Sequence, residues 1–369
     1  MTNNLDAVFD SPGALTLDNL LRSPQVSQIC INRHDLIFYW DASGPKKITE
    51  RIFQNSEDYK RWLNTLLRMT DVGYSDVETA RTSVIEGSFR PDLTNLYGSI
   101  HISTKELTRD EPALTVRKQP RDVVTLDQMH ANNVMNTEMR FFLEQAVRGR
   151  LNILISGGSG AGKTTLARAF AQFIDPANRI VTAEEIDELH LQDRLDNVVA
   201  LTTYRLRDSE GRNIRETSLD DLVREALRMR ADRIWVGETR GREAYALVKA
   251  CNSGHDGSVT TVHADSGAQA IDQLVTYVME SGLEAAVSQK QVSRAFNLVV
   301  QVGRERMGRR VIREITELEP ALEGAQQRSS PIFAYDPDSE QFVSRGRPSR
   351  RLIQAMARYG VNYDDYTSR

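Results

Sequence analysis

Residues Leu151–Phe170 read LNILISGGSGAGKTTLARAF. An apolar segment that is typical of a strand, Leu151–Ile155, leads into a glycine-rich turn and then into a helix-forming run. This is the phosphate-binding pattern G-x-x-x-x-G-K-[ST] in the strand–loop–helix order that it requires. A glycine-rich turn that merely precedes a helix is the alternative, but the complete motif with both flanks in place favours a P-loop.

The P-loop predicts which residues would hold a nucleoside triphosphate. Glycines permit positive φ and close backbone approach, so successive N–H groups can face the phosphates while the next helix presents its positive end. Lys163 is expected to reach the β- and γ-phosphate oxygens, and the Thr164 hydroxyl is expected to ligate Mg²⁺. The predicted nucleotide-binding residues of the loop are Gly157, Gly158, Ser159, Gly160, Ala161, Gly162, Lys163, Thr164 and Thr165.

The composition is that of a globular protein with room for two domains: 369 residues, of which 40% are hydrophobic and 27% are charged. A formal net charge of −4 gives no overall attraction to nucleic acid, so no specific nucleic-acid binding is predicted. Two cysteines, Cys30 and Cys251, cannot form a disulfide framework, which favours a reducing cytoplasm. No apolar stretch reaches the ~18 residues of a membrane span and the N-terminal residues do not have the pattern of a signal peptide, so membrane association is expected only through the surface or through partners.

The order of predicted elements indicates two domains and a C-terminal extension. Residues 1–122 alternate short strands and helices and are expected to form a smaller α+β N-terminal domain. From 123 to 320, helices and strands alternate, which predicts an α/β domain with a doubly wound sheet around the P-loop. This domain closes with a predicted hairpin, Ala295–Arg304 and Arg310–Leu318. Residues 321–369 are expected to add a small hairpin and a basic helix.

Three further stretches narrow the kind of P-loop protein. They are Val181–Leu191 (VTAEEIDELHL), Asp232–Ala244 (DRIWVGETRGREA) and Ser253–Ser266 (SGHDGSVTTVHADS). In order, spacing and composition they resemble the Asp box, the Walker B region and the His box of the hexameric secretion ATPases, which serve type II and type IV secretion and type IV and tight-adherence pili. The stretches ERMGRRVIREITEL and PIFAYDPDSEQF look closest to the conjugation and tight-adherence branch of that family.

The resemblance implies more than a nucleotide site. It implies a RecA-like P-loop domain, ATP and Mg²⁺ as ligands, Mg²⁺-dependent ATP hydrolysis and a homo-oligomer, in this family a hexamer. It also implies partners among inner-membrane platform or secretion-channel proteins, and a cytoplasmic place at the inner face of the cytoplasmic membrane. An ATP-gated scaffold with little turnover and a DNA-translocating P-loop ATPase are the alternatives.

Roles for polar residues at strand ends follow from the resemblance. Glu238, after the apolar strand RIWV, corresponds to the Walker B acid, which holds Mg²⁺ through water or orients the attacking water, so Thr164 and Glu238 are the predicted metal residues. Arg240 corresponds to an arginine that bridges subunits or organises the site. His263, at the end of SVTTV, is placed where a γ-phosphate could be sensed. An exposed or structural side chain is the ordinary alternative for each of the three.

The Asp box departs from the family pattern. The chain reads Ala183-Glu184-Glu185-Ile186-Asp187-Glu188-Leu189, whereas the family has Ile-Glu-Asp, a turn with proline and then Glu-Leu. Glu184 is the predicted general base and Glu185 is its main rival, because four carboxylates lie within five residues. An acidic turn that caps a helix is the alternative.

Two weaker assignments complete the predicted site. His255 is either a phosphate sensor or a residue that orders its own loop. Arg117, in the stretch ALTVRK, resembles an arginine that approaches the nucleotide from the N-terminal domain, where a guanidinium suits phosphate oxygens. The family also has Gly-Ser-Arg upstream; this chain has Gly98-Ser99-Ile100, with Arg90 as a substitute. An exposed charged loop is the alternative for these arginines.

Overall fold

The computed structural model describes residues 12–41, 43–72, 75–80, 82–89, 94, 96–118, 123–207, 213–305, 308–320 and 328–363. Two compact units make up the chain: residues 1–122 with 205–216, and residues 123–204 with 217–369. Within the described ranges, no helix has both the length and the apolar character needed to cross a membrane.

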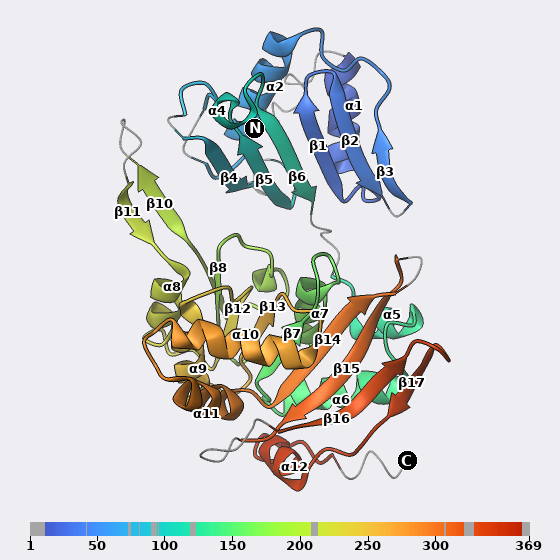
Figure 1. The fold of residues 1–369 in the computed structure, drawn as a ribbon, viewed down its shortest axis with the longest axis vertical. Coiled ribbons are helices and arrows are strands. Elements are labelled where there is room, and N and C mark those ends of the chain that lie inside the picture. The colour runs from blue at the N-terminus through green and yellow to red at the C-terminus, as the bar shows by residue number, and fades with distance from the viewer. Residues whose placement is uncertain are drawn as a thin grey trace. The chain divides into compact units, whose positions relative to one another are not determined.

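The first unit is built on a six-stranded antiparallel sheet in the order β3-β2-β1-β6-β5-β4 (Figure 1). Alternate residues of its central strands, such as Ile29 and Ile31 of β1, are buried against α2, which contributes Tyr59 and Leu63 to the same core. Its elements are α1 (Pro12–Arg22), β1 (Gln28–Arg33), β2 (Leu36–Asp41), β3 (Gly44–Lys47), α2 (Ser56–Arg68), β4 (Val84–Ser88), β5 (Gly98–Ser103), α4 (Lys105–Thr108) and β6 (Ala113–Lys118).

The second unit contains a nine-stranded sheet in the order β17-β16-β15-β14-β7-β13-β12-β8-β9. Its helices are α5 (Leu126–Ala131), α6 (Thr137–Arg148), α7 (Lys163–Phe170), α8 (Leu219–Ala226), α9 (Glu243–Asn252), α10 (Gly267–Met279), α11 (Ala285–Ala295) and α12 (Arg350–Ala357). Its strands are β7 (Ile153–Ser156), β8 (Ile180–Glu184), β9 (Val198–Thr202), β12 (Arg233–Val236), β13 (Val259–Val262), β14 (Leu298–Arg304), β15 (Arg310–Leu318), β16 (Ser329–Asp336) and β17 (Gln341–Ser344). A separate two-stranded hairpin is formed by β10 (Tyr204–Arg207) and β11 (Asn213–Thr217).

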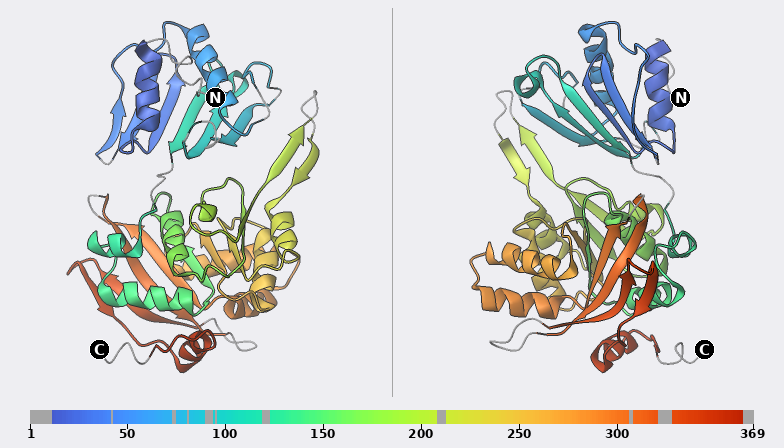
Figure 2. Two further views of the ribbon diagram at one scale, coloured as in Figure 1. Left: turned by 180° about the vertical axis from the view of Figure 1, so that it is seen from behind. Right: turned by 45° about the vertical axis from the view of Figure 1, so that its right-hand side comes forward.

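The six strands from β14 to β9 run parallel, so their carboxyl ends meet at one edge of the sheet. Helices cover both faces of this sheet (Figure 2). Along β7, Ile153 and Ile155 belong to the core cluster under α6 and α7, whereas Leu154 belongs to the cluster under α9 and α10. Because both faces are buried, the strand is apolar throughout and holds the P-loop on a rigid base.

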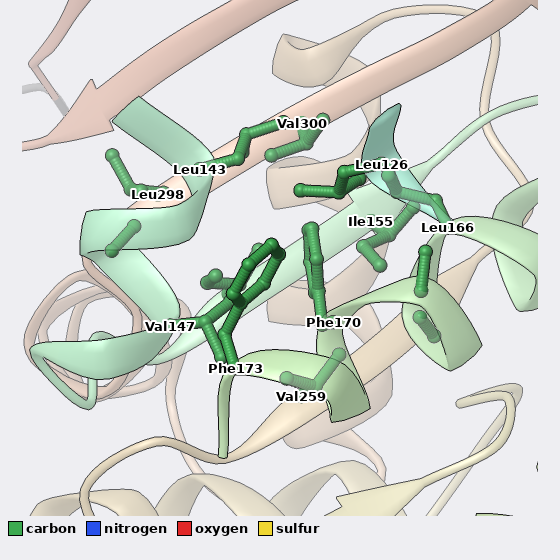
Figure 3. Close-up of a cluster of buried hydrophobic side chains, with 14 of the residues drawn as sticks. Leu126, Leu143, Val147, Ile155, Leu166, Phe170, Phe173, Val259, Leu298 and Val300 are labelled. Carbon is green, nitrogen blue, oxygen red and sulfur yellow. The ribbon is translucent and has the colours of Figure 1, made fainter. Parts of the chain in front are cut away.

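The cluster beneath the P-loop helix is drawn in Figure 3. Phe170 and Leu166 of α7 lie there with Leu143 of α6 and Val300 of β14, all nearly inaccessible to solvent. Burial of this apolar surface fixes α7, whose first residue is Lys163, against the strand that precedes the loop.

The fold class predicted from the sequence, a P-loop α/β domain preceded by an α+β domain, is confirmed. Two features differ in detail. The run NVVALTTY, Asn197–Tyr204, has the apolar, β-branched composition of a single strand, but it contributes to two, β9 and β10. Residues 321–369, set apart as an extension on sequence grounds, contribute β16 and β17 to the same sheet as the P-loop strand.

Candidate nucleotide site

The P-loop lies between β7 and α7 at the carboxyl edge of the sheet. Gly162 has φ +103° and precedes the first residue of α7, a conformation that side chains rarely adopt. A Cβ at Gly157 would lie 2.4 Å from the carbonyl oxygen of Val302 on β14, so only glycine fits there. Glycine at these positions therefore lets the loop turn sharply and lie close to β14, a backbone geometry that fits the binding of a polyphosphate.

Lys163 connects the P-loop to the strand that carries His263. Its side chain is buried, and Nζ donates to the carbonyl oxygens of Gly157 and Gly158 at 2.9 and 3.1 Å. The same Nζ lies 3.2 Å from Nδ1 of His263. Strands β7 and β13 are parallel neighbours with Ser156 opposite Val262, which explains why the residues that follow them meet.

Glu238, Arg240, Glu185 and His263 form one network of polar contacts. Oε1 of Glu238 lies 2.8 Å from Nε2 of His263, and its Oε2 accepts from the Arg240 guanidinium at 2.8 Å. A second nitrogen of Arg240 lies 3.1 Å from Oε2 of Glu185. The hydrogen bond to Glu238, together with the nearby carboxylates, raises the pKa of Arg240, so the guanidinium stays charged. The structure therefore brings Glu238 and His263, which follow two neighbouring strands, into direct contact.

Glu184 is buried, with 3% of its surface exposed. Its Oε1 accepts from the backbone N–H groups of Glu188 and Leu189, each at 3.2 Å. A Cβ at Gly237 would lie 2.6 Å from that same oxygen, so the glycine before Glu238 makes room for the Glu184 carboxyl group. Burial, and secondarily the charge of Asp187, raise the pKa of Glu184 well above its usual value. This geometry makes Glu184 an anchor of the Asp box loop.

The buried position of Glu184 gives a pH-dependent prediction. A carboxyl group whose pKa is raised by folding contributes stability at low pH, which is lost as pH rises from its unfolded pKa through its folded pKa. Glu184→Gln keeps the shape but cannot ionise. We expect the variant to gain stability relative to the wild type as pH rises from about 4 to 8, measured by urea unfolding at several pH values. A constant difference between the two proteins over that range would contradict the assignment.

Glu188 is the carboxylate that the sequence did not single out. It lies in the loop after Glu184, is partly buried, and its Oε2 accepts from the Thr164 hydroxyl at 3.5 Å. Glu185, the expected rival of Glu184, is exposed and directed to Arg240. A run of four carboxylates signals an acidic loop but not which member points to the P-loop, because that depends on how the loop turns after β8.

Gln301 of β14 is a second residue near the site that no sequence motif predicts. Its buried side chain accepts from the Ser156 hydroxyl at 2.6 Å and donates to the carbonyl oxygen of Ala264 at 3.2 Å. It thereby ties the last residue of β7 to the segment just after His263. The only signal in the sequence is one polar residue inside the apolar run LVVQV.

Two predicted site residues are not brought to the P-loop by the contacts of the second unit. His255 precedes β13 and therefore lies at the opposite edge of the sheet from His263, with Nδ1 3.2 Å from the carbonyl oxygen of Ala250. This supports the expected alternative, a residue that orders its own loop. Arg117 lies exposed on β6 of the first unit, and its role remains a prediction. Arg90 lies outside the described residues.

A cavity of about 410 Å³ lies beside the P-loop, lined by Gly158, His263, Ala264, Asp265, Gln269 and Gln273. Within the described ranges, no cluster of three or more histidine, cysteine or acidic side chains has the arrangement of a self-sufficient metal site. Oxygen donors are present at Thr164 and Glu188, which lie 3.5 Å apart, and at Glu238, which contacts His263 beside Lys163. This donor set fits Mg²⁺, which proteins usually hold through one or two carboxylates together with phosphate oxygens of the substrate.

Comparison with known proteins finds similar sequences and similar folds. A family model described as "Type II/IV secretion system protein" matches residues 97–352. A Mycobacterium tuberculosis protein named for conjugal transfer is 31% identical over 313 residues, which cover 84% of this chain and 85% of that one. The conjugal transfer protein TrbB of Rhizobium radiobacter is 35% identical over 211 residues, which cover 56% and 61%. The solved ATPase DotB of Legionella pneumophila shares the fold, with a TM-score of 0.55 at 21% identity over 83% of this chain and 80% of that one.

Proposed function

Because the chain belongs to the type II/IV secretion system protein family, we propose that it hydrolyses ATP with Mg²⁺ and, as a homo-oligomeric ring, powers a pilus-assembly or secretion machine. One observation carries the proposal: Lys163 of the P-loop, His263 and Glu238 lie in consecutive contact at the carboxyl edge of the sheet. In the proposed site Lys163 would bind the γ-phosphate, His263 would sense it and Glu238 would act on it through Mg²⁺ or water. Inner-membrane platform or secretion-channel proteins would be the partners that ATP hydrolysis drives.

Each residue of the site has a role in this proposal. Lys163 and the loop amides hold the β- and γ-phosphates, and a bound Mg²⁺, held with Thr164 and Glu238, would neutralise phosphate charge. His263 and Arg240 stabilise negative charge that grows on the transferred group. Since Arg240 also pairs with Glu185, it can link closure of the Asp box loop to the position of Glu238.

The carboxylate that orients the attacking water is best assigned to Glu188. Glu184 is buried and occupied by two backbone N–H groups, and Glu185 is exposed and paired with Arg240. Glu188 alone of the three has a contact with the residue after the P-loop lysine. A carboxylate there can accept a proton from water positioned beside the γ-phosphate.

The assignment is tested by single-turnover ATP hydrolysis with Glu188→Gln and its matched neighbour Glu185→Gln. Loss of the base is expected to slow hydrolysis by Glu188→Gln about 100-fold, with ATP affinity changed only a few-fold. Glu185→Gln should lose less than about tenfold, because it removes one exposed ion pair. A larger loss for Glu185→Gln would transfer the role to Glu185.

The wider proposal has its own outcomes. Wild-type turnover should require Mg²⁺ and stop on chelation, and sizing with and without ATP should reveal an oligomer. Absence of turnover together with tight ATP binding would point to a nucleotide-gated scaffold, and a monomer in both states would contradict the ring.

A further inference from the structure

Two arginines face each other at the turn end of the β14–β15 hairpin. Arg304 is the last residue of β14 and Arg310 the first of β15, and they are directly opposite in the antiparallel register. Like charges at such a position destabilise a hairpin. The repulsion between Arg304 and Arg310 must therefore be offset by contacts with residues outside β14 and β15.

Both guanidinium groups reach the same atom of the P-loop. Nε of Arg304 donates to the carbonyl oxygen of Gly160 at 3.1 Å, and Nε of Arg310 donates to it at 3.3 Å. Gly160 has φ +65°, and a Cβ there would lie 2.7 Å from a terminal nitrogen of Arg304. A side chain at this position would push the guanidinium away, so the glycine is needed for the contact as well as for the backbone conformation.

The Gly160 carbonyl is linked to the rest of the loop through its own peptide group. In a trans peptide the N–H of the next residue points away from the carbonyl oxygen. That N–H, on Ala161, donates to the carbonyl oxygen of Gly158 at 3.3 Å, and Gly158 also accepts from Lys163 at 3.1 Å. The hydrogen bonds that fix the Gly160 carbonyl oxygen therefore also fix the turn from Gly158 to Ala161, which contacts Lys163.

The charges of this pair are not neutralised as those of its neighbours are. Arg313 lies 2.7 Å from Glu305, and Arg309 lies 3.5 Å from Glu340. Among the residues that the structure describes, neither Arg304 nor Arg310 has a carboxylate within 4 Å. Two uncompensated positive charges beside a phosphate-binding loop favour an anion in that loop.

We propose that Arg304 and Arg310 form a clamp on the outside of the P-loop, which sets the loop for polyphosphate binding and raises its affinity for nucleotide. The inference rests on the proposed nucleotide site and adds two positioning residues to it. The clamp acts on nucleotide binding and not on the hydrolytic step, because both groups contact the loop from its carbonyl side.

The test measures binding of a fluorescent ADP and steady-state ATP hydrolysis by Arg304→Gln, Arg310→Gln and the double variant. Arg309→Gln is the matched control, since Arg309 lies on the same hairpin but contacts Tyr335 and Glu340. The double variant is expected to bind ADP about tenfold or more weakly, in line with the loss of two charge-assisted hydrogen bonds. KM for ATP should rise in parallel, and kcat at saturation should stay within about threefold of the wild type. The Arg309→Gln variant should stay within about twofold in all three quantities.

Separate outcomes distinguish the clamp from the proposed function. Unchanged ADP affinity in the double variant, or a fall in kcat without a change in affinity, overturns the clamp while ATP hydrolysis by the wild type stands. If the wild type binds ADP but does not hydrolyse ATP, the proposed function is overturned, and the ADP affinities of the variants still test the clamp. If the wild type does not bind ADP, both proposals are overturned.

The glutamine variants relieve the like-charge pair, so their melting temperatures should equal or exceed that of the wild type. Should they fail to fold, Arg310→Lys, which keeps the charge but loses the Nε donor, is expected to weaken ADP binding by a few-fold, and unchanged binding would overturn the clamp.

Discussion

Lys163→Ala is expected to lower ATP hydrolysis about 100- to 1,000-fold, the range seen when a single preorganised donor to a developing charge is removed. The lysine is buried, holds two carbonyl oxygens of the loop and lies beside His263, so its loss removes both phosphate charge neutralisation and the contact between the P-loop and the His box. The measurement is phosphate release at saturating ATP and Mg²⁺.

Lys249→Ala is the control for this prediction. Lys249 is an exposed lysine of α9 in the same unit, so its removal is expected to leave turnover within about twofold. Circular dichroism of both variants would establish that the fold is retained. Hydrolysis by Lys163→Ala at a rate near that of the wild type would remove the basis for the nucleotide site.

Asn152→Ala is expected to destabilise the second unit by about 3–6 kcal/mol, because three buried backbone groups lose their partners at about 1–3 kcal/mol each and some relaxation follows. Asn152 is 4% exposed and immediately precedes β7. Its Nδ2 donates to the carbonyl oxygen of Ala295 at 2.7 Å, and its Oδ1 accepts from the N–H groups of Gly257 and Ser258 at 2.8 and 2.9 Å. The side chain therefore joins the starts of three neighbouring strands.

Urea unfolding followed by circular dichroism measures the effect, and hydrogen exchange at Gly257 and Ser258 localises it. Asn252→Ala serves as the comparison, since that asparagine is exposed and makes one bond, to the carbonyl oxygen of Gln291 at 3.1 Å. We expect it to cost less than about 1 kcal/mol. Equal losses of unfolding free energy in the two variants would show that the three hydrogen bonds of Asn152 do not stabilise the sheet as proposed.

The two predictions concern opposite ends of the parallel strands. Asn152 lies before β7 and Lys163 follows the loop after it, so the position of Asn152 affects the position of the P-loop through the short strand Ile153–Ser156. Gln301 acts between them on the site side by bonding Ser156 and Ala264. Stability of the sheet and geometry of the site are thus coupled through the strand that carries the P-loop.

The sequence by itself determined the P-loop, the alternation of strands and helices around it and the family resemblance, because these depend on local residue types and spacing. Glycines at fixed offsets and an apolar strand such as RIWV are each signals within a few residues. For the same reason Glu238 and His263 could be placed at strand ends before any contact between them was known.

Only the tertiary structure decided which polar residues meet. Glu184 is buried against Gly237 while Glu188 turns toward Thr164, and one run of carboxylates cannot reveal that division because it depends on how the loop packs against β12. His255 and His263 stand eight residues apart at opposite ends of one short strand, so the direction of the strand decides that His263, and not His255, lies beside the P-loop. Gln301 bonds to Ser156, and Arg304 and Arg310 bond to Gly160, across separations of 144–150 positions in the chain. Contacts of that separation leave no local pattern and arise only when β14 is placed beside β7.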